Sequence, residues 1–108
     1  MSTLDACQIS TVTTDDEVVV VVAGEVDLLS RDALSGVLTK AQGQSRDLVL
    51  DLSAATFMDS SGLHVVLDAF QAQRATGRRF SLRAPSTPVV RVLEMAGLDG
   101  VLPISPHP

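Results

Sequence analysis

Apolar residues follow two patterns along the chain, and the first is that of β-strands. Residues 7–12 alternate loosely between apolar and polar side chains, whereas residues 17–23 form a continuous valine-rich run that ends at Gly24. An uninterrupted β-branched run indicates a strand that is central in its sheet or buried on both faces, because a half-exposed strand would alternate. Asp15 and Asp16 separate the two runs and are typical turn residues. We therefore expect the chain to begin with a β-hairpin.

The second pattern is helical, and it begins after Asp27. Apolar side chains recur at helical spacing, at Leu34, Val37, Leu38 and Ala41. This spacing predicts an amphipathic helix with Ser30 as its N-cap and Gly43 just past its end. A second buried strand is then expected at residues 47–52.

A second amphipathic helix is expected after the segment 56–62. Its apolar stripe is formed by four residues, Leu63, Val66, Leu67 and Phe70. Polar side chains lie off that stripe, at His64, Asp68, Gln71 and Arg74, and Gly77 closes the helix.

One more strand and one more helix are predicted in the remainder. A short strand at residues 80–83 precedes a proline-containing turn, in which Thr87 can cap a third helix and Pro88 can take its first position. This helix is expected to end at Met95 or Ala96, before Gly97.

The end of the chain is rich in proline. Val101 and Leu102 are candidates for a last edge strand, and residues 103–108 are expected to form an irregular tail.

The order of these elements, β-β-α-β-α-β-α-(β), predicts an α/β fold. Strand–helix–strand crossovers dominate, so the sheet should be mixed, with parallel pairs after the opening hairpin. We expect four to five strands and three to four helices. A chain of 108 residues is long enough for one modest core, so residues 1–108 are interpreted as a single domain.

Composition excludes several classes of function. The net charge is −5, tryptophan and tyrosine are absent, and Arg78 with Arg79 is too short a run for a basic track, so nucleic acid is not an expected partner. These two arginines are interpreted as a solvated turn. The longest apolar run, residues 18–23, is far too short to cross a membrane, and residues 1–9 do not resemble a secretory signal. We therefore expect a cytoplasmic protein that does not bind membranes.

Cysteine and histidine are too sparse for a metal site or a disulfide. The chain has a single cysteine, Cys7, and its histidines are His64 and His107. Cys7 is interpreted as a buried or half-buried strand residue. No metal or other cofactor is expected.

Polar residues gather at the start of the second predicted helix, in Asp59-Ser60-Ser61-Gly62. The N–H groups at a helix start are unpaired and carry a partial positive charge, so a hydroxyl there could bear a phosphate that these groups partly stabilise. A phosphoryl group would add roughly two negative charges beside Asp59 and could repel a partner. The alternative is that Asp59 or Ser60 is simply the N-cap of the helix.

Several segments together resemble the STAS-domain family of anti-sigma-factor antagonists. Residues 57–63, Phe-Met-Asp-Ser-Ser-Gly-Leu, resemble the family's phosphorylation loop, and residues 24–27, Gly-Glu-Val-Asp, resemble its turn after the second strand. The strand before the serines and residues 95–98, Met-Ala-Gly-Leu, also match. The resemblance extends to about Leu102.

The resemblance implies a phosphorylation switch in transcription regulation, with no enzyme activity in this chain. Unphosphorylated antagonist binds an anti-sigma factor and frees the sigma factor, and the anti-sigma factor, a serine kinase of the GHKL type, phosphorylates the serine after the aspartate. That serine corresponds to Ser60. A phosphatase resets the cycle, and ATP belongs to the kinase. The implied docking residues on this chain are Asp27, Asp59, Ser61, Gly62 and His64.

Two features depart from the family pattern. His64 stands where many members have a small residue, which places an imidazole near the docking face, although a solvated surface histidine is the alternative. The proline-rich tail leaves little room for the usual last helix. An uncovered strand edge there could favour self-association, so we expect a monomer or a weak dimer.

Three other functions fit the sequence less well. A hydrolase would need a glycine two residues before Ser60 and a suitably placed base, and neither is found. A STAS regulatory subunit of a transporter or other signalling complex would share the fold without phosphorylation. Nucleotide binding at Ser61 and Gly62 would lack the glycine-rich loop and lysine that such sites use.

Overall fold

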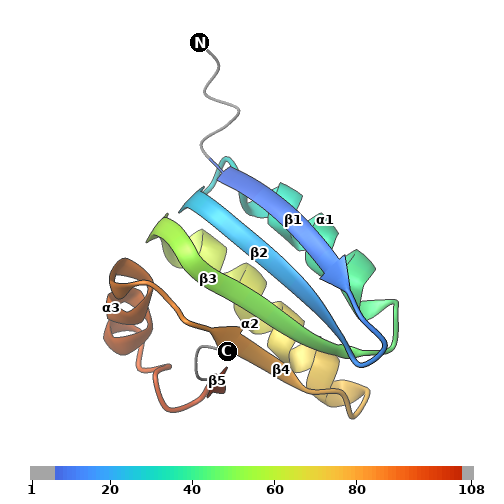
Figure 1. The fold of residues 1–108 in the computed structure, drawn as a ribbon. Helices are drawn as coiled ribbons and strands as arrows, with labels where there is room; N and C mark the ends of the chain where they lie inside the picture. The colour runs from blue at the N-terminus through green and yellow to red at the C-terminus, as the bar shows by residue number, and fades with distance from the viewer. Residues whose placement is uncertain (1–6, 106–108) are drawn as a thin grey trace.

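The computed structural model describes residues 7–105, which form a five-stranded sheet and three helices. The strands are β1 (Cys7–Thr13), β2 (Glu17–Val26), β3 (Asp47–Met58), β4 (Phe80–Arg83) and β5 (Ile104–Ser105). The helices are α1 (Arg31–Gln42), α2 (Ser60–Ala75) and α3 (Thr87–Met95). The strands lie in chain order across the sheet (Figure 1).

The sheet is mixed, as the order of elements predicts. β1 and β2 form an antiparallel hairpin, and β2, β3, β4 and β5 then pair in parallel. β2 lies inside the sheet, between β1 and β3, and Val18, Val20 and Val22 are fully buried. The predicted position of the valine run is therefore confirmed.

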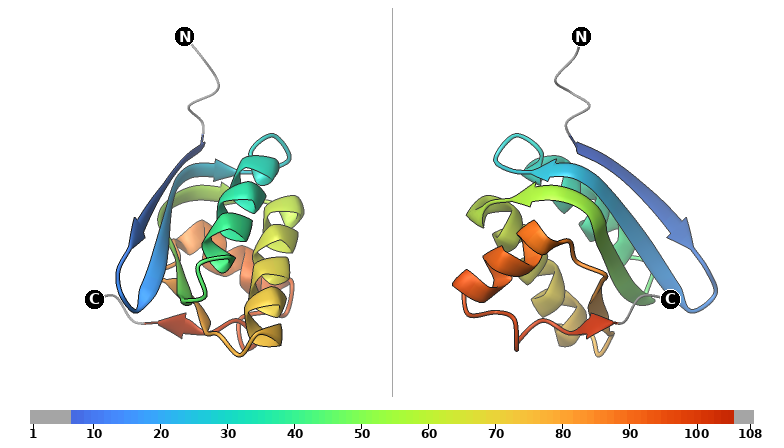
Figure 2. Two further views of the ribbon diagram at one scale, coloured as in Figure 1. Left: turned by 90° about the vertical axis from the view of Figure 1, so that its right-hand side faces the viewer. Right: turned by 60° about the vertical axis from the view of Figure 1, so that its left-hand side comes forward.

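The molecule has two layers, because α1 and α2 cover the same face of the sheet (Figure 2). Buried side chains from both layers form one apolar cluster, which includes Leu34 and Leu38 of α1 and Val66 of α2. α3 packs beside the second half of β3, past the end of β4, and contributes Val89 and Leu93 to the same cluster. Burying each such side chain contributes about 1.5–3 kcal/mol, which makes this cluster the main source of stability.

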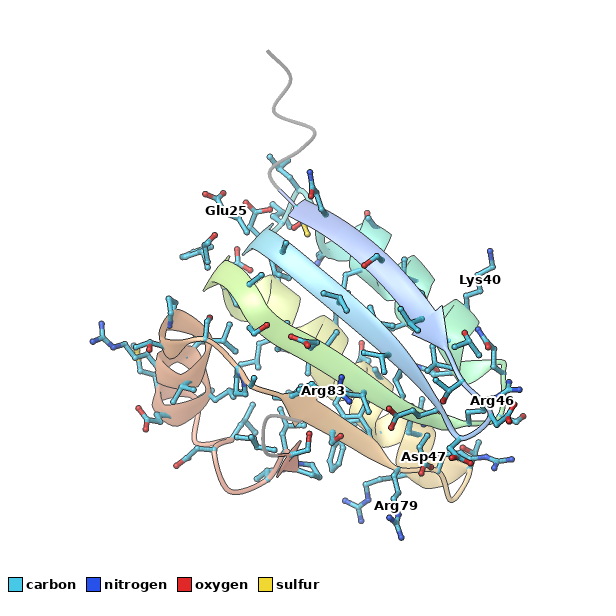
Figure 3. All side chains as sticks on the ribbon, in the orientation of Figure 1. Glu25, Lys40, Arg46, Asp47, Arg79 and Arg83 are labelled. Carbon is cyan, nitrogen blue, oxygen red and sulfur yellow. The ribbon has the colours of Figure 1, made fainter. Side chains whose placement is uncertain are left out.

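No helix covers the other face of the sheet within residues 7–105 (Figure 1). Val49 is nevertheless only 7% exposed there. An ion pair between Arg83 of β4 and Glu17 of β2, at 3.5 Å, spans β3 next to it. Figure 3 shows Arg83 on this face.

Two strands extend further than the sequence pattern predicts. Gly24 was expected to end β2, but with φ +98° it allows a register shift against β3, and the strand continues to Val26. β3 was expected to end at Leu52 but runs to Met58, because Ala54, Ala55, Phe57 and Met58 still pair with β2 after the polar Ser53.

The last strand also differs from prediction. Val101 and Leu102 lie in a turn, where the Val101 N–H donates to the Leu98 carbonyl at 3.0 Å. The strand is Ile104–Ser105, inside the segment expected to be irregular. Pro103 does not prevent the pairing, because its carbonyl accepts from the Leu82 N–H at 2.8 Å. The rest of the expected tail lies outside the described residues.

Helix boundaries agree closely with the sequence signals. α1 begins after Ser30 and ends at Gly43, as predicted. For α3 the prediction was one residue late: Ser86 is the N-cap, and its hydroxyl donates to the Ala55 carbonyl, while Thr87 is the first helical residue. Leu67 is only partly buried, and Ala69 and Gln73 complete the buried face of α2.

Residues 7–105 contain no helix that is both long enough and apolar enough to span a membrane.

Cys7 is half-buried at the start of β1, as expected.

Candidate functional site

The predicted site residues meet at one edge of the sheet, where β2 and β3 end. Val26 pairs with Met58, and the Asp59 N–H donates to the Val26 carbonyl at 3.1 Å. Because parallel strands end at the same edge, the turn after β2 and the start of α2 are brought together. Figure 1 shows both strand ends at the same edge, near the beginning of α2.

Asp59 is the N-cap of α2. Its carboxylate accepts from the Ser61 N–H at 2.9 Å, from the Gly62 N–H at 3.1 Å and from the Ser61 hydroxyl at 2.6 Å. The Ser61 hydroxyl, followed by the N–H groups of Gly62, Ser61 and Leu28, holds the pKa of this carboxyl below its ordinary value. The capping role that the sequence left open therefore belongs to Asp59.

The two adjacent serines differ in their surroundings. The Ser61 hydroxyl is committed to Asp59. Ser60 is the first residue of α2 and is exposed, and within residues 7–105 no hydrogen bond engages its hydroxyl. An approaching enzyme would thus meet a free hydroxyl at Ser60.

The N–H groups expected to favour a phosphate at this helix start are already occupied. Those of Ser61 and Gly62 point to Asp59, so a phosphoryl group on Ser60 would have to compete with that carboxylate for them. The stabilisation that the sequence suggested is correspondingly smaller.

Gly62 has a packing role in the structure. It is buried, and a Cβ atom there would lie 2.6 Å from Cγ1 and 3.0 Å from the carbonyl oxygen of Val26. The absence of a side chain lets the first turn of α2 approach the end of β2 closely.

Asp27 orders the turn between β2 and α1. Its carboxylate accepts from the Leu29 N–H at 3.0 Å and from the Ser30 N–H at 3.2 Å. The Ser30 hydroxyl accepts from the Asp27 N–H at 3.0 Å and donates to the Glu25 carbonyl at 2.9 Å. These bonds give the turn a defined shape close to the start of α2.

This turn presents two leucines that the sequence analysis did not select. Leu28 is 63% exposed and Leu29 is 91% exposed, and Phe57, which pairs with Glu25 near the end of β3, is 47% exposed. Large apolar side chains gathered at one edge are typical of a protein-binding surface. The available signal was the position of the two leucines, which lie outside the helical spacing of Leu34 and Leu38.

His64 is exposed on α2, one helical turn beyond Ser60 and on the same face. No hydrogen bond among residues 7–105 joins it to Ser60. The predicted residues therefore gather at one edge, with Ser60 and His64 exposed, Asp27 and Asp59 ordering the backbone, and Gly62 packed beneath them.

Comparisons with known proteins agree with this architecture. The family model of the STAS domain matches residues 8–108. The anti-sigma-B factor antagonist of Bacillus subtilis (strain 168) is 30% identical over 91 residues, which span 84% of this chain and 84% of that protein. The anti-sigma F factor antagonist of Paenibacillus polymyxa is 33% identical over 88 residues, which span 80% of this chain and 75% of that protein.

Solved structures share the same fold. The crystal structure of an anti-sigma factor antagonist from Mycobacterium paratuberculosis superposes with a TM-score of 0.84 at 28% identity, covering 100% of this chain and 91% of that one. The anti-sigma factor antagonist SpoIIAA in its unphosphorylated form superposes with a TM-score of 0.78 at 26% identity, covering 95% of this chain and 89% of that one. SpoIIAA from Bacillus in its phosphorylated form superposes with a TM-score of 0.72 at 25% identity, covering 95% of this chain and 92% of that one. By its sequence and its fold, this chain belongs to the STAS domain family.

Proposed function

We propose that this protein is an anti-sigma-factor antagonist whose binding is switched by phosphorylation of Ser60. The observation that carries the proposal is the contrast between the two serines: Ser60 is exposed and free, whereas Ser61 is bound to Asp59. The names of the similar proteins support the same function, and SpoIIAA has been solved in both unphosphorylated and phosphorylated forms.

The proposed docking surface is the edge that contains Ser60, His64 and the Leu28–Leu29 turn. In the unphosphorylated state Ser60 is neutral, and the exposed leucines can enter apolar hollows on the anti-sigma factor. Asp27 and Asp59 act mainly by holding this surface in shape, through their bonds to backbone N–H groups.

Phosphorylation would be carried out by the partner and not by this chain. The Ser60 oxygen would attack the γ-phosphorus of ATP bound to the kinase; the bond from that phosphorus to ADP breaks, and the hydroxyl proton passes to a base of the kinase. A phosphatase would hydrolyse the ester and return the free hydroxyl. The antagonist needs no cofactor of its own in this cycle.

The phosphoryl group would weaken docking by its charge. It adds roughly two negative charges at neutral pH. Asp59 is already ionised next to it and occupies the N–H groups of Ser61 and Gly62, so little in this chain offsets the new charge. A partner surface complementary to the neutral serine would then disfavour the phosphoserine.

Intact-mass measurement with peptide mapping tests the proposal. The purified protein is incubated with ATP and each candidate anti-sigma kinase from the same genome, with Ser60→Ala and Ser61→Ala as matched variants. We expect one phosphoryl group on the wild type and on Ser61→Ala, and none on Ser60→Ala. Stable binding to a candidate without any phosphorylation would keep the docking role and disprove the switch.

A further inference from the structure

A separate pocket lies at the opposite end of α2, roughly 20 Å along the helix axis from Ser60. It has a volume of about 540 Å³ and is formed where α2 ends, β4 begins and the segment before β5 returns. Its principal lining residues are Phe70, Arg74, Arg78, Arg79, Phe80 and Pro103. This volume falls within the range of small-molecule sites, roughly 300–1,000 Å³.

The wall of the pocket is apolar. Phe70 and Phe80 line it, and their rings lie 6.1 Å apart with an inclination of 59°. The guanidinium of Arg74 lies over the Phe70 ring, 5.5 Å from its centre. This stacking holds the guanidinium of Arg74 at the rim of the pocket.

The backbone that carries Arg78 and Arg79 is held in place by hydrogen bonds. Gln73 is buried, with 1% of its surface exposed, and its side-chain amide donates to the carbonyls of Arg79 at 2.9 Å and Arg46 at 3.1 Å. The Arg79 N–H donates to the Asp47 carboxylate at 3.0 Å, and Gly77 turns the chain with φ +73°. Arg78 and Arg79 are exposed after this turn, as predicted, and the hydrogen bonds also order their backbone.

The charges at this rim are unpaired. Residues 7–105 contain two ion pairs, Arg31–Asp32 and Glu17–Arg83, and neither involves Arg74, Arg78 or Arg79. The chain as a whole carries eight basic residues against thirteen acidic ones, yet three of the basic residues line this one pocket. Figure 3 shows Arg79 projecting from the turn, with Asp47 nearby on the adjacent strand.

We propose that this pocket binds a small amphiphilic acid, with its apolar body against Phe70, Phe80 and Pro103 and its carboxylate among the three arginines. Arginine suits this role because its planar fork donates two parallel hydrogen bonds to a carboxylate. The apolar wall selects against simple inorganic anions, and the unpaired positive charges select against neutral apolar compounds. The inference goes beyond the phosphorylation switch and does not depend on it.

Titration with three probes, followed by ¹H–¹⁵N NMR of the whole chain, tests the proposal. The probes are 2-naphthoate, the neutral 2-naphthalenemethanol and inorganic phosphate. We expect 2-naphthoate to shift the amide signals of Arg78, Arg79, Phe80 and Ser81 saturably, and the neutral analogue to bind at least about tenfold more weakly. Phosphate alone should leave these signals in place. Equal binding of the neutral analogue, a matching response to phosphate, or no saturable shift with 2-naphthoate would overturn the proposal.

Matched arginine variants separate the pocket from general surface charge. Arg78→Gln should weaken binding of 2-naphthoate about tenfold. Arg91→Gln removes the same charge from an exposed position on α3 and should leave binding unchanged. An equal loss in both variants would show that net charge, and not this pocket, attracts the acid. Unchanged chemical shifts outside the pocket would confirm that each variant is folded.

Discussion

The hydroxyl of Ser61 donates to the carboxylate of Asp59 at 2.6 Å, and this bond distinguishes two serines that are adjacent in the sequence. It stabilises the start of α2 and engages the Ser61 hydroxyl within the chain. Ser60, one position earlier, keeps an exposed hydroxyl.

Substitutions of Ser60 should show whether negative charge at this position weakens binding of the partner. Ser60→Ala should keep the fold and bind the anti-sigma factor constitutively, whereas Ser60→Asp should weaken binding about tenfold or more through like-charge repulsion. Titration calorimetry with the purified partner measures both. Ser45→Asp is the matched control: it adds the same charge on an exposed left-handed residue before β3, a conformation that aspartate tolerates. Equal affinities of the alanine and aspartate variants at Ser60 would contradict the mechanism.

The stability contributed by Asp59 should depend on pH. Its pKa is lower in the folded protein than its ordinary value, so its contribution is present above about pH 3.9 and is lost as the pH falls through the folded pKa. Asp59→Asn keeps a capping side chain but cannot titrate in this range. Urea unfolding at pH 6 and pH 2 should show a wild-type advantage over Asp59→Asn that shrinks at the lower pH. A constant difference would mean that the charge of Asp59 does not stabilise the helix.

The exposed leucines should contribute to binding and not to folding. Leu29 is 91% exposed, so Leu29→Ser should lower partner affinity about tenfold while leaving the melting temperature nearly unchanged. Met95→Ser is a matched control, because Met95 is 88% exposed at the end of α3. Surface plasmon resonance would measure both. An unaffected Leu29→Ser variant would remove this turn from the docking surface.

Asp27 should act on affinity through the same turn. Asp27→Ala removes the acceptor for the N–H groups of Leu29 and Ser30 and should loosen the turn without unfolding the domain. We expect weaker binding, seen as a larger dissociation constant, and a melting temperature that falls by a few degrees at most. An unchanged dissociation constant would exclude Asp27 from the docking face.

Gly62 should tolerate no side chain. Gly62→Ala would press a methyl group against Val26 and should cost about 1–3 kcal/mol of unfolding free energy. At Gly36, inside α1, a methyl group would have no neighbouring atom within 4 Å, so Gly36→Ala should instead stabilise by about 0.5–1 kcal/mol. Thermal unfolding of the two variants measures both changes in stability. Equal and favourable effects would show that α2 can move away from β2 without cost.

The local signals of the sequence were sufficient to predict the helices and the family. Helical spacing and the residues Ser30, Gly43 and Gly77 identified the first two helices, because these signals act within one or two turns of the chain. The ends of β2 and β3 were missed because strand pairing is nonlocal: the second half of β3 pairs with β2, although Ser53, Ala54 and Ala55 do not continue the apolar pattern of the strand. Ile104 and Ser105 form β5 for the same reason.

The sequence predicted which polar residues form the site, but not which of them bind one another and which stay exposed. Asp59 and Ser60 follow from the helix start and from the family resemblance, yet only the three-dimensional arrangement shows that Asp59 binds Ser61. Leu28 and Leu29 were missed because exposure cannot be read from residue type. Gln73 was missed as well, since a buried amide is recognised only through the carbonyls it contacts.

The close approach of Gly62 to Val26 has a consequence for association. It joins the start of α2 to the end of β2, and Asp27 orders the turn that follows, so packing and hydrogen bonds connect Ser60 and the two leucines. A rigid surface loses little conformational entropy when it is bound, which leaves more of the contact energy available as affinity. In the proposed switch, a single phosphoryl group on Ser60 would then change the occupancy of the complex without any segment having to fold or unfold.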